Sequence, residues 1–66
     1  MVTFQVNDMS CGHCVGVITR AVKDADRDAE VRIDLNKHIV EIEPKGADAE
    51  KLRAAIAQAG YTPVAR

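Results

Sequence analysis

The chain alternates apolar and polar positions in short stretches and changes to helical spacing in two longer ones. Val2, Phe4 and Val6 alternate with polar neighbours, which predicts a half-buried strand near the start of the chain. The same period of two recurs at residues 31–35 and 40–43. These stretches are predicted to be a second and a third strand. The tight turn between them is expected at Asn36 and Lys37, because asparagine tolerates a left-handed backbone.

Two stretches carry the apolar stripe of a helix, which repeats every three to four residues. The first predicted helix begins at His13 or Cys14 and ends in the acidic segment 24–28, whose carboxylates are expected to be solvated surface. The second follows Asp48, a good N-cap, and stops at Gly60, because glycine readily takes the backbone conformation that ends a helix. The stripes consist of Val17, Ile18, Ala21, Val22 and Ala25, and of Leu52, Ala55, Ile56 and Ala59.

Residues 61–65 are predicted to form a short final strand. Pro63 favours a sheet edge for it, because proline cannot donate a ladder hydrogen bond. The order β-α-β-β-α-β makes an α+β chain with two split β-α-β halves. Sharing one four-stranded antiparallel sheet, with both helices on one face, these halves give the ferredoxin-like arrangement. In this topology three connections meet at one end of the sheet: the segment after the first strand, the turn at 36–37 and the junction at 60–61.

The chain length and charge narrow the class of protein. At 66 residues, the range 1–66 is a single small domain. Nine Lys and Arg against ten Asp and Glu, with one Phe and one Tyr, argue against a nucleic-acid binder. The sequence shows no apolar run of membrane-spanning length and no signal-peptide pattern. The expected location is therefore the cytoplasm, where thiols stay reduced.

Both cysteines lie in one hexapeptide between the first strand and the first helix, Met9-Ser10-Cys11-Gly12-His13-Cys14. Two thiols at this spacing can hold a soft metal ion, cycle through a disulfide, or belong to a larger metal site. The helix N-terminus favours thiolate over thiol at Cys14 and at Cys11 just before it. Two thiolates suit Cu(I), which accepts two or three sulfur ligands, whereas a closed zinc site needs four ligands. Neither thiol is expected to belong to the apolar core.

The hexapeptide resembles the MxCxxC loop of heavy-metal-associated domains, and most closely that of bacterial copper chaperones of the CopZ type. Tyr61, after the second helix, also fits the bacterial pattern. The resemblance implies that Cys11 and Cys14 bind one Cu(I), for which Ag(I) is a mimic. It also implies that the ion passes by ligand exchange to a soluble domain of a copper-transporting P-type ATPase, without enzyme activity. Ser10 stands where relatives that handle Zn(II), Cd(II) or Pb(II) often carry Asp, which favours Cu(I).

Two other interpretations stay open. One is a metal-binding domain detached from a copper ATPase, although the start at Met1 and the lack of a linker favour a free-standing chaperone. The other is a small dithiol oxidoreductase, because Cys-Gly-His-Cys is also the active-site sequence of protein disulfide isomerases. Those domains are longer, usually carry an aromatic residue where this chain has Ser10, and need a cis-proline loop facing the cysteines.

The remaining side chains near the thiols are expected to support the site. Met9 is predicted to pack into the core and brace the loop. His13 is predicted to face solvent and tune the thiolates rather than bind metal. Tyr61 is either ordinary core or a shield with its hydroxyl near a thiolate. His38 is expected to be a surface strand residue at the same end of the sheet.

Self-association is expected to depend on metal. The apo protein is predicted to be a monomer. Two sulfurs leave Cu(I) open to a thiolate from a second copy, so a weak Cu(I)-bridged homodimer is predicted.

Overall fold

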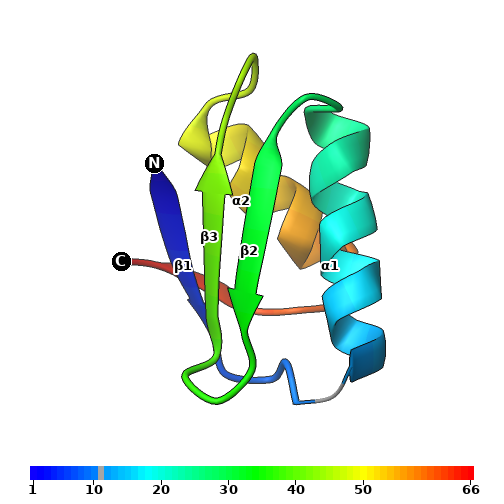
Figure 1. Cartoon of the computed structure of the whole chain (residues 1–66), viewed down its shortest axis with the longest axis vertical. Helices are drawn as coiled ribbons and strands as arrows, with labels where there is room; N and C mark the ends of the chain where they lie inside the picture. Colours follow the sequence, from blue (N-terminus) through cyan, green and yellow to red (C-terminus); the bar gives the residue numbers. More distant parts are fainter. Residues whose placement is uncertain (11) are drawn as a thin grey trace.

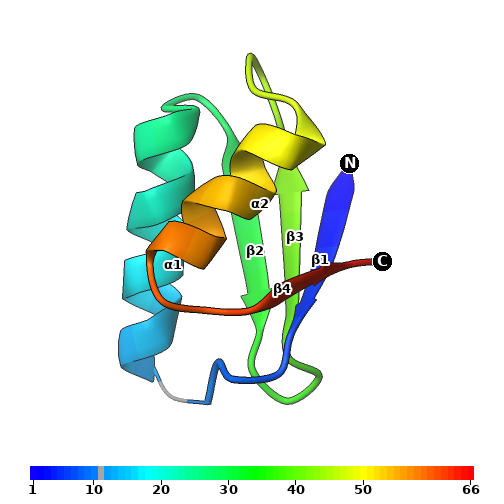
Figure 2. The same cartoon turned by 180° about the vertical axis from the view of Figure 1, so that it is seen from behind.

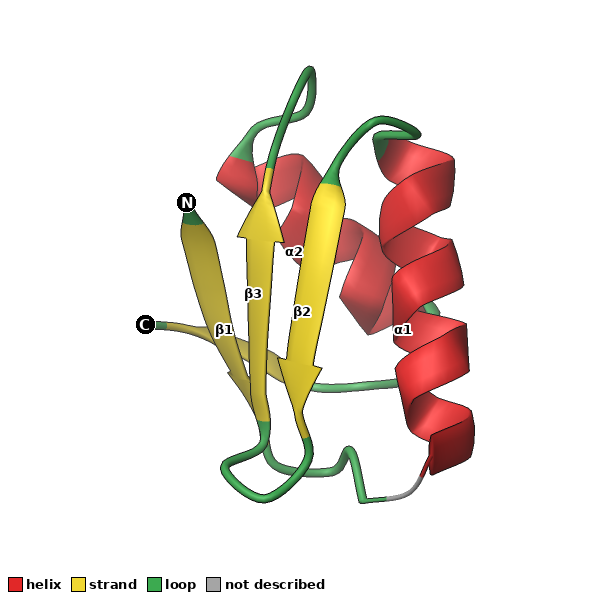
Figure 3. Ribbon diagram, viewed as in Figure 1, coloured by secondary structure: helices red, strands yellow, loops and turns green. Residues whose placement is uncertain are grey.

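The computed structural model describes residues 1–10 and 12–66, and these residues form strands and helices in the predicted order. The elements are β1 (Val2–Val6), α1 (Gly12–Ala25), β2 (Glu30–Asp34), β3 (Ile39–Glu43), α2 (Ala49–Gln58) and β4 (Pro63–Ala65). The strands make one antiparallel sheet, and the helices pack against the same face of it (Figures 1 and 3). The predicted ferredoxin-like α+β fold is confirmed.

The sheet order is β2-β3-β1-β4, which places β1 inside the sheet and β4 at an edge. Phe4 of β1 lies opposite Val40 of β3, and Val6 lies opposite Pro63 of β4. Figure 2 shows the chain leaving α2 and running across to pair with β1. The edge position predicted from Pro63 is confirmed, and it leaves the missing N–H of proline outside the ladder.

The core lies between the sheet and the two helices. The strands contribute every second residue to this core. The alternation of apolar and polar residues that predicted the strands therefore corresponds to the core-facing and open faces of the sheet. Val31 and Ile33 are only half-buried, because β2 is an edge strand. The apolar side chains with at most 1% exposure are Phe4, Val6, Met9, Ile18, Val22, Ala29, Val40, Ile42, Leu52 and Ile56.

Both predicted ends of α2 are confirmed. The Asp48 side chain accepts a hydrogen bond from the backbone N–H of Lys51 at 2.8 Å, which satisfies one of the unpaired donors of the first turn. At the other end Gly60 has a φ of 103°, a left-handed conformation that glycine adopts without strain. At its start, α1 includes Gly12, one residue before the predicted range.

The turn between β2 and β3 differs from the prediction. β2 ends at Asp34, whose carboxylate accepts the backbone N–H groups of Asn36 and Lys37 at 3.0 and 3.2 Å. This Asx-type bonding closes the turn at its start, and the left-handed residue is His38, with a φ of 57°, rather than Asn36. His38 is therefore a half-buried turn residue, and the prediction of a surface strand position is wrong.

The acidic segment after α1 also differs from the prediction at one residue. Asp24 and Asp28 are exposed as expected, but Asp26 is only 8% exposed. Its Oδ2 accepts three consecutive backbone N–H groups, from Lys45 at 2.8 Å, Gly46 at 2.8 Å and Ala47 at 3.0 Å. These bonds, that from Ala47 first, lower the pKa of Asp26 from 3.8 to about 2.

Candidate metal centre

The loop between β1 and α1 is fixed to the fold at Met9. Its backbone N–H donates to the Val6 carbonyl at 3.2 Å, and its side chain is fully buried in the core. The prediction that Met9 packs into the core is confirmed. The next residue, Ser10, is exposed. The loop therefore leaves the core at this point, directly before the first cysteine.

Cys14 lies in the first turn of α1 with 8% of its surface exposed, and it packs at the margin of the core. The expectation that neither thiol belongs to the apolar core is wrong for Cys14. The reason was present in the sequence: Cys14, Ile18 and Val22 are four residues apart and so share one face of the helix. Cys11 lies outside the described residues, so its place beside Cys14 stays a prediction.

One feature of the surroundings of Cys14, its place at a helix N-terminus, favours a thiolate, whereas its burial opposes ionisation. The N-terminus of a helix presents unpaired N–H groups and a partial positive charge. The first turn of α1 contains no acidic residue that would oppose this effect. His13 is exposed, in agreement with a solvent-facing side chain, and its tuning role stays a prediction.

The three predicted connections lie near one another toward one end of the molecule: in Figure 1 the β1–α1 loop and the β2–β3 turn are at the bottom, and the α2–β4 connection crosses above them. The His38 Nδ1 lies 2.7 Å from the Met9 carbonyl oxygen, which joins the β2–β3 turn to the loop. The Thr62 backbone N–H donates to Asp8 Oδ1 at 3.2 Å, which joins the α2–β4 connection to the same loop. The topology predicted that His38 lies at this end, but the hydrogen bonds of Asp8, His38 and Thr62 to and from the loop were not predicted.

Tyr61 follows Gly60 in the α2–β4 connection. Its side chain is half-buried and packs against the core, and its backbone N–H donates to the Ile56 carbonyl at 3.4 Å. Tyr61 therefore contributes to the core. Whether its hydroxyl also shields a thiolate stays a prediction.

The described side chains do not offer a metal site of their own. Within residues 1–10 and 12–66, no group of three or more His, Cys, Asp or Glu side chains is arranged to hold a metal ion. The nearest carboxylate along the loop, that of Asp8, already accepts a backbone hydrogen bond. That Cys14 and Cys11 together hold an ion at this end stays a prediction. Such a donor set is soft and incomplete for zinc, and it fits Cu(I).

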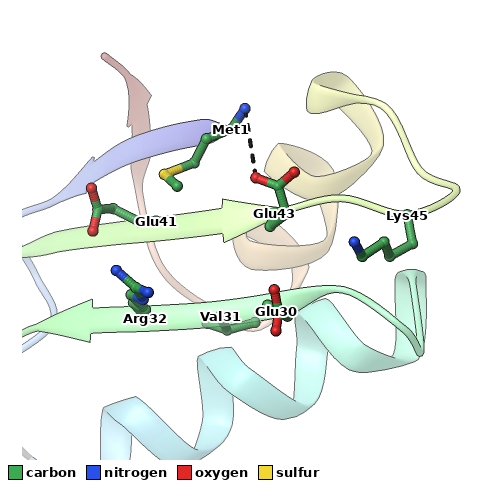
Figure 4. A pocket seen from close by; sticks show the side chains of 7 residues that line it. All are labelled: Met1, Glu30, Val31, Arg32, Glu41, Glu43 and Lys45. Atoms are coloured by element: carbon green, nitrogen blue, oxygen red, sulfur yellow. Dashed lines mark ion pairs between the residues drawn. The ribbon is translucent and has the colours of Figure 1, made fainter.

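A shallow hollow of about 420 Å³ lies on the helix-free face of the sheet, at the end away from the loop (Figure 4). Met1, Arg32, Glu43 and Lys45 are among its lining residues, and the Met1 amino group lies 3.9 Å from the Glu43 carboxylate. Its polar and charged lining is separate from the cysteine loop. This hollow is not part of the candidate metal centre.

No helix within the described part of the chain is long and apolar enough to cross a membrane.

Comparison with known proteins identifies the family. Residues 3–62 match the heavy-metal-associated domain. A COP-associated protein from Helicobacter felis is 37% identical over 57 residues, which cover 85% of this chain and 86% of that protein. A solved gold binding protein superposes with a TM-score of 0.93 at 32% identity, with 100% of both chains covered.

A second solved structure is the copper chaperone Atx1 from Synechocystis PCC6803, in a form described as trimeric. It superposes with a TM-score of 0.92 at 34% identity, covering 97% of this chain and 100% of its own. The family match spans both helices and most of the sheet, and these superpositions extend over nearly the whole fold. The chain belongs to the heavy-metal-associated domain family.

Proposed function

We propose that this chain is a Cu(I) chaperone that binds one Cu(I) ion through Cys11 and Cys14 and passes it on by ligand exchange. The observation that supports this most is the place of Cys14, which is nearly buried in the first turn of α1 and lies three positions after Cys11 in the sequence. The related proteins are named for copper and gold, two soft metals that prefer thiolate ligands.

The proposed transfer conserves both the thiolates and the oxidation state of copper. Cu(I) on two sulfurs can accept a third, so a thiolate of the partner adds to the ion first. One Cu–S bond to Cys14 or Cys11 then breaks, and the released sulfur stays as a thiolate or takes up a proton. A second exchange completes the transfer. The helix N-terminus stabilises the released Cys14 thiolate, which lowers the cost of this step.

The partner we propose is the soluble metal-binding domain of a copper-transporting P-type ATPase, and the compartment is the cytoplasm. The motif resemblance and the need for reduced thiols support both. The same site would also serve in a domain detached from such an ATPase. The proposal includes no catalytic step.

Titration of the reduced protein with Cu(I) against a strong competing chelator tests the site. We expect one Cu(I) per chain, and we expect Cys11→Ser or Cys14→Ser to abolish tight binding. Ser10→Ala is the matched control, because Ser10 is exposed and adjacent to the first cysteine. It should bind as the wild type does.

Three results would contradict the proposal. A double cysteine variant that keeps wild-type affinity would place the ion elsewhere. Stronger binding of Zn(II) than of Cu(I) in matched titrations would overturn the choice of metal. Reduction of insulin disulfides without Cu(I) binding would favour the dithiol oxidoreductase instead.

A further inference from the structure

His38 makes an unusual bridge from the β2–β3 turn to the loop that precedes Cys11. Its backbone is left-handed, with a φ of 57°, and its Nδ1 lies 2.7 Å from the Met9 carbonyl oxygen. A carbonyl oxygen can only accept a hydrogen bond, so Nδ1 carries the proton and donates. The left-handed backbone places the ring where this bond can form, and histidine is one of the few residues that adopt this conformation with some frequency.

Both ends of this bridge are firmly held. The His38 carbonyl accepts the Val6 backbone N–H at 2.8 Å and the Gln5 side-chain amide at 3.2 Å. Met9 is anchored by its fully buried side chain and by its N–H on the Val6 carbonyl. The imidazole therefore connects two fixed points and sets the direction of one carbonyl.

That carbonyl belongs to the peptide unit that leads into the cysteine motif. The peptide between Met9 and Ser10 is planar, so the direction of the Met9 carbonyl also fixes the direction of the Ser10 N–H and the position of the Ser10 Cα. Ser10 itself is exposed, so core packing does not fix its position.

We propose that His38 is a positioning residue for the loop between β1 and α1 (the metal loop), and that it orients the Met9–Ser10 peptide, directly before the proposed ligand Cys11, through its Nδ1. The proposal rests on the proposed role of Cys11 and Cys14 as the Cu(I) ligands. Loss of a supporting hydrogen bond around a metal site typically weakens metal binding about 10-fold or more, and we expect an effect of about this lower size.

Three variants separate positioning from general stability. His38→Asn keeps an amide donor near the place of Nδ1 and tolerates the left-handed backbone. His38→Gly tolerates the same backbone but removes the donor. Gln5→Ala is the matched control, because it removes the hydrogen bonds to the carbonyls of Lys37 and His38 while the Val6–His38 and His38–Met9 bonds remain. It loosens the turn and leaves the bridge itself in place.

Each variant is measured in the apo state and with Cu(I). In apo protein, the amide NMR shifts of Ser10 and Gly12 should move in His38→Gly and stay near wild type in His38→Asn and Gln5→Ala. In chelator competition, His38→Gly should bind Cu(I) about 10-fold more weakly, with His38→Asn restoring most of the affinity. Thermal unfolding of each apo variant shows whether a change in affinity merely follows a change in stability.

The positioning role is overturned if His38→Gly keeps wild-type shifts and affinity, or if Gln5→Ala loses as much affinity at equal stability. Failure of His38→Asn to restore the Ser10 shift would equally exclude the donor as the cause. These outcomes are distinct from failure of the proposed function, in which the wild-type protein itself binds no Cu(I).

Discussion

Cys14 has two roles at the scale of a single residue, because the same sulfur is a proposed ligand and a part of the core. It shares the buried face of α1 with Ile18 and Val22, and only 8% of its surface is exposed to solvent. A substitution at this position should therefore affect stability as well as metal binding, which distinguishes Cys14 from a ligand on an open loop.

We expect Cys14→Ala to abolish tight Cu(I) binding and to lower the free energy of unfolding of the apo protein by about 1 kcal/mol, because it removes one buried heavy atom from the core. Chemical denaturation of the apo protein measures this. His13→Ala is the control, since His13 is the exposed neighbour in the same turn, and a change within about 0.5 kcal/mol is expected for it. If apo Cys14→Ala were as stable as the wild type, the sulfur would contribute nothing to the core.

At the scale of elements, a single carboxylate joins two connections at the end of the molecule away from the metal loop. Asp26 follows α1, and its Oδ2 accepts the N–H groups of Lys45, Gly46 and Ala47, which lead from β3 to α2. This bonding links the end of α1 to the segment before α2 through one ionised side chain. It also makes the stability of the fold depend on pH, through the ionisation of Asp26.

The pH dependence follows from the lowered pKa of Asp26, about 2 in the fold against an ordinary 3.8. The unfolded chain therefore binds the proton first, so the stabilisation is complete above about pH 4 and is lost as the pH falls through 2. We expect Asp26→Asn to lower the unfolding midpoint at pH 7 and to flatten the acid dependence over this range. Cu(I) affinity should not change, because the metal loop is at the other end.

Asp24→Asn is the matched control for this experiment, because Asp24 is an exposed carboxylate in the last turn of the same helix. Its unfolding midpoint should follow that of the wild type from pH 7 to pH 2. Equal losses in the two variants would show that general charge, rather than the three hydrogen bonds, accounts for the effect.

Helix ends that depend on near neighbours in the sequence could be predicted, and the topology placed the connections, but individual hydrogen bonds between distant segments could not be predicted. Asp48 and Gly60 end α2 through bonds and backbone geometry within a few residues, and both were predicted. The partners of Asp26 lie 19 to 21 residues away, and that of His38 lies 29 residues away. No periodicity indicates such contacts. Cys14 is intermediate, since its spacing to Ile18 already indicated a buried face.

At the scale of the whole molecule, the metal loop lies at one end of the longest axis (Figure 1), and this placement limits how two copies can meet. The molecule measures 28 × 21 × 18 Å, so an end face is about 21 by 18 Å. A standard stable interface buries about 800 Å² of accessible surface on each partner, and one end of so small a molecule offers little area for such contact. Protein contacts alone should therefore not hold a dimer through the loop.

A bridging ion changes this balance, because Cu(I) on two sulfurs can accept a thiolate from a second copy. We expect the apo protein to sediment as a monomer and the Cu(I)-loaded protein to form a weak dimer as its concentration rises. A partner domain with its own pair of cysteines should compete for the same coordination position and dissociate the dimer.

Cys11→Ser, treated with Cu(I) under the same conditions, is the control that should stay monomeric. A stable apo dimer, or a loaded protein that stays monomeric at every concentration, would show that the site is closed and would argue against transfer by ligand exchange.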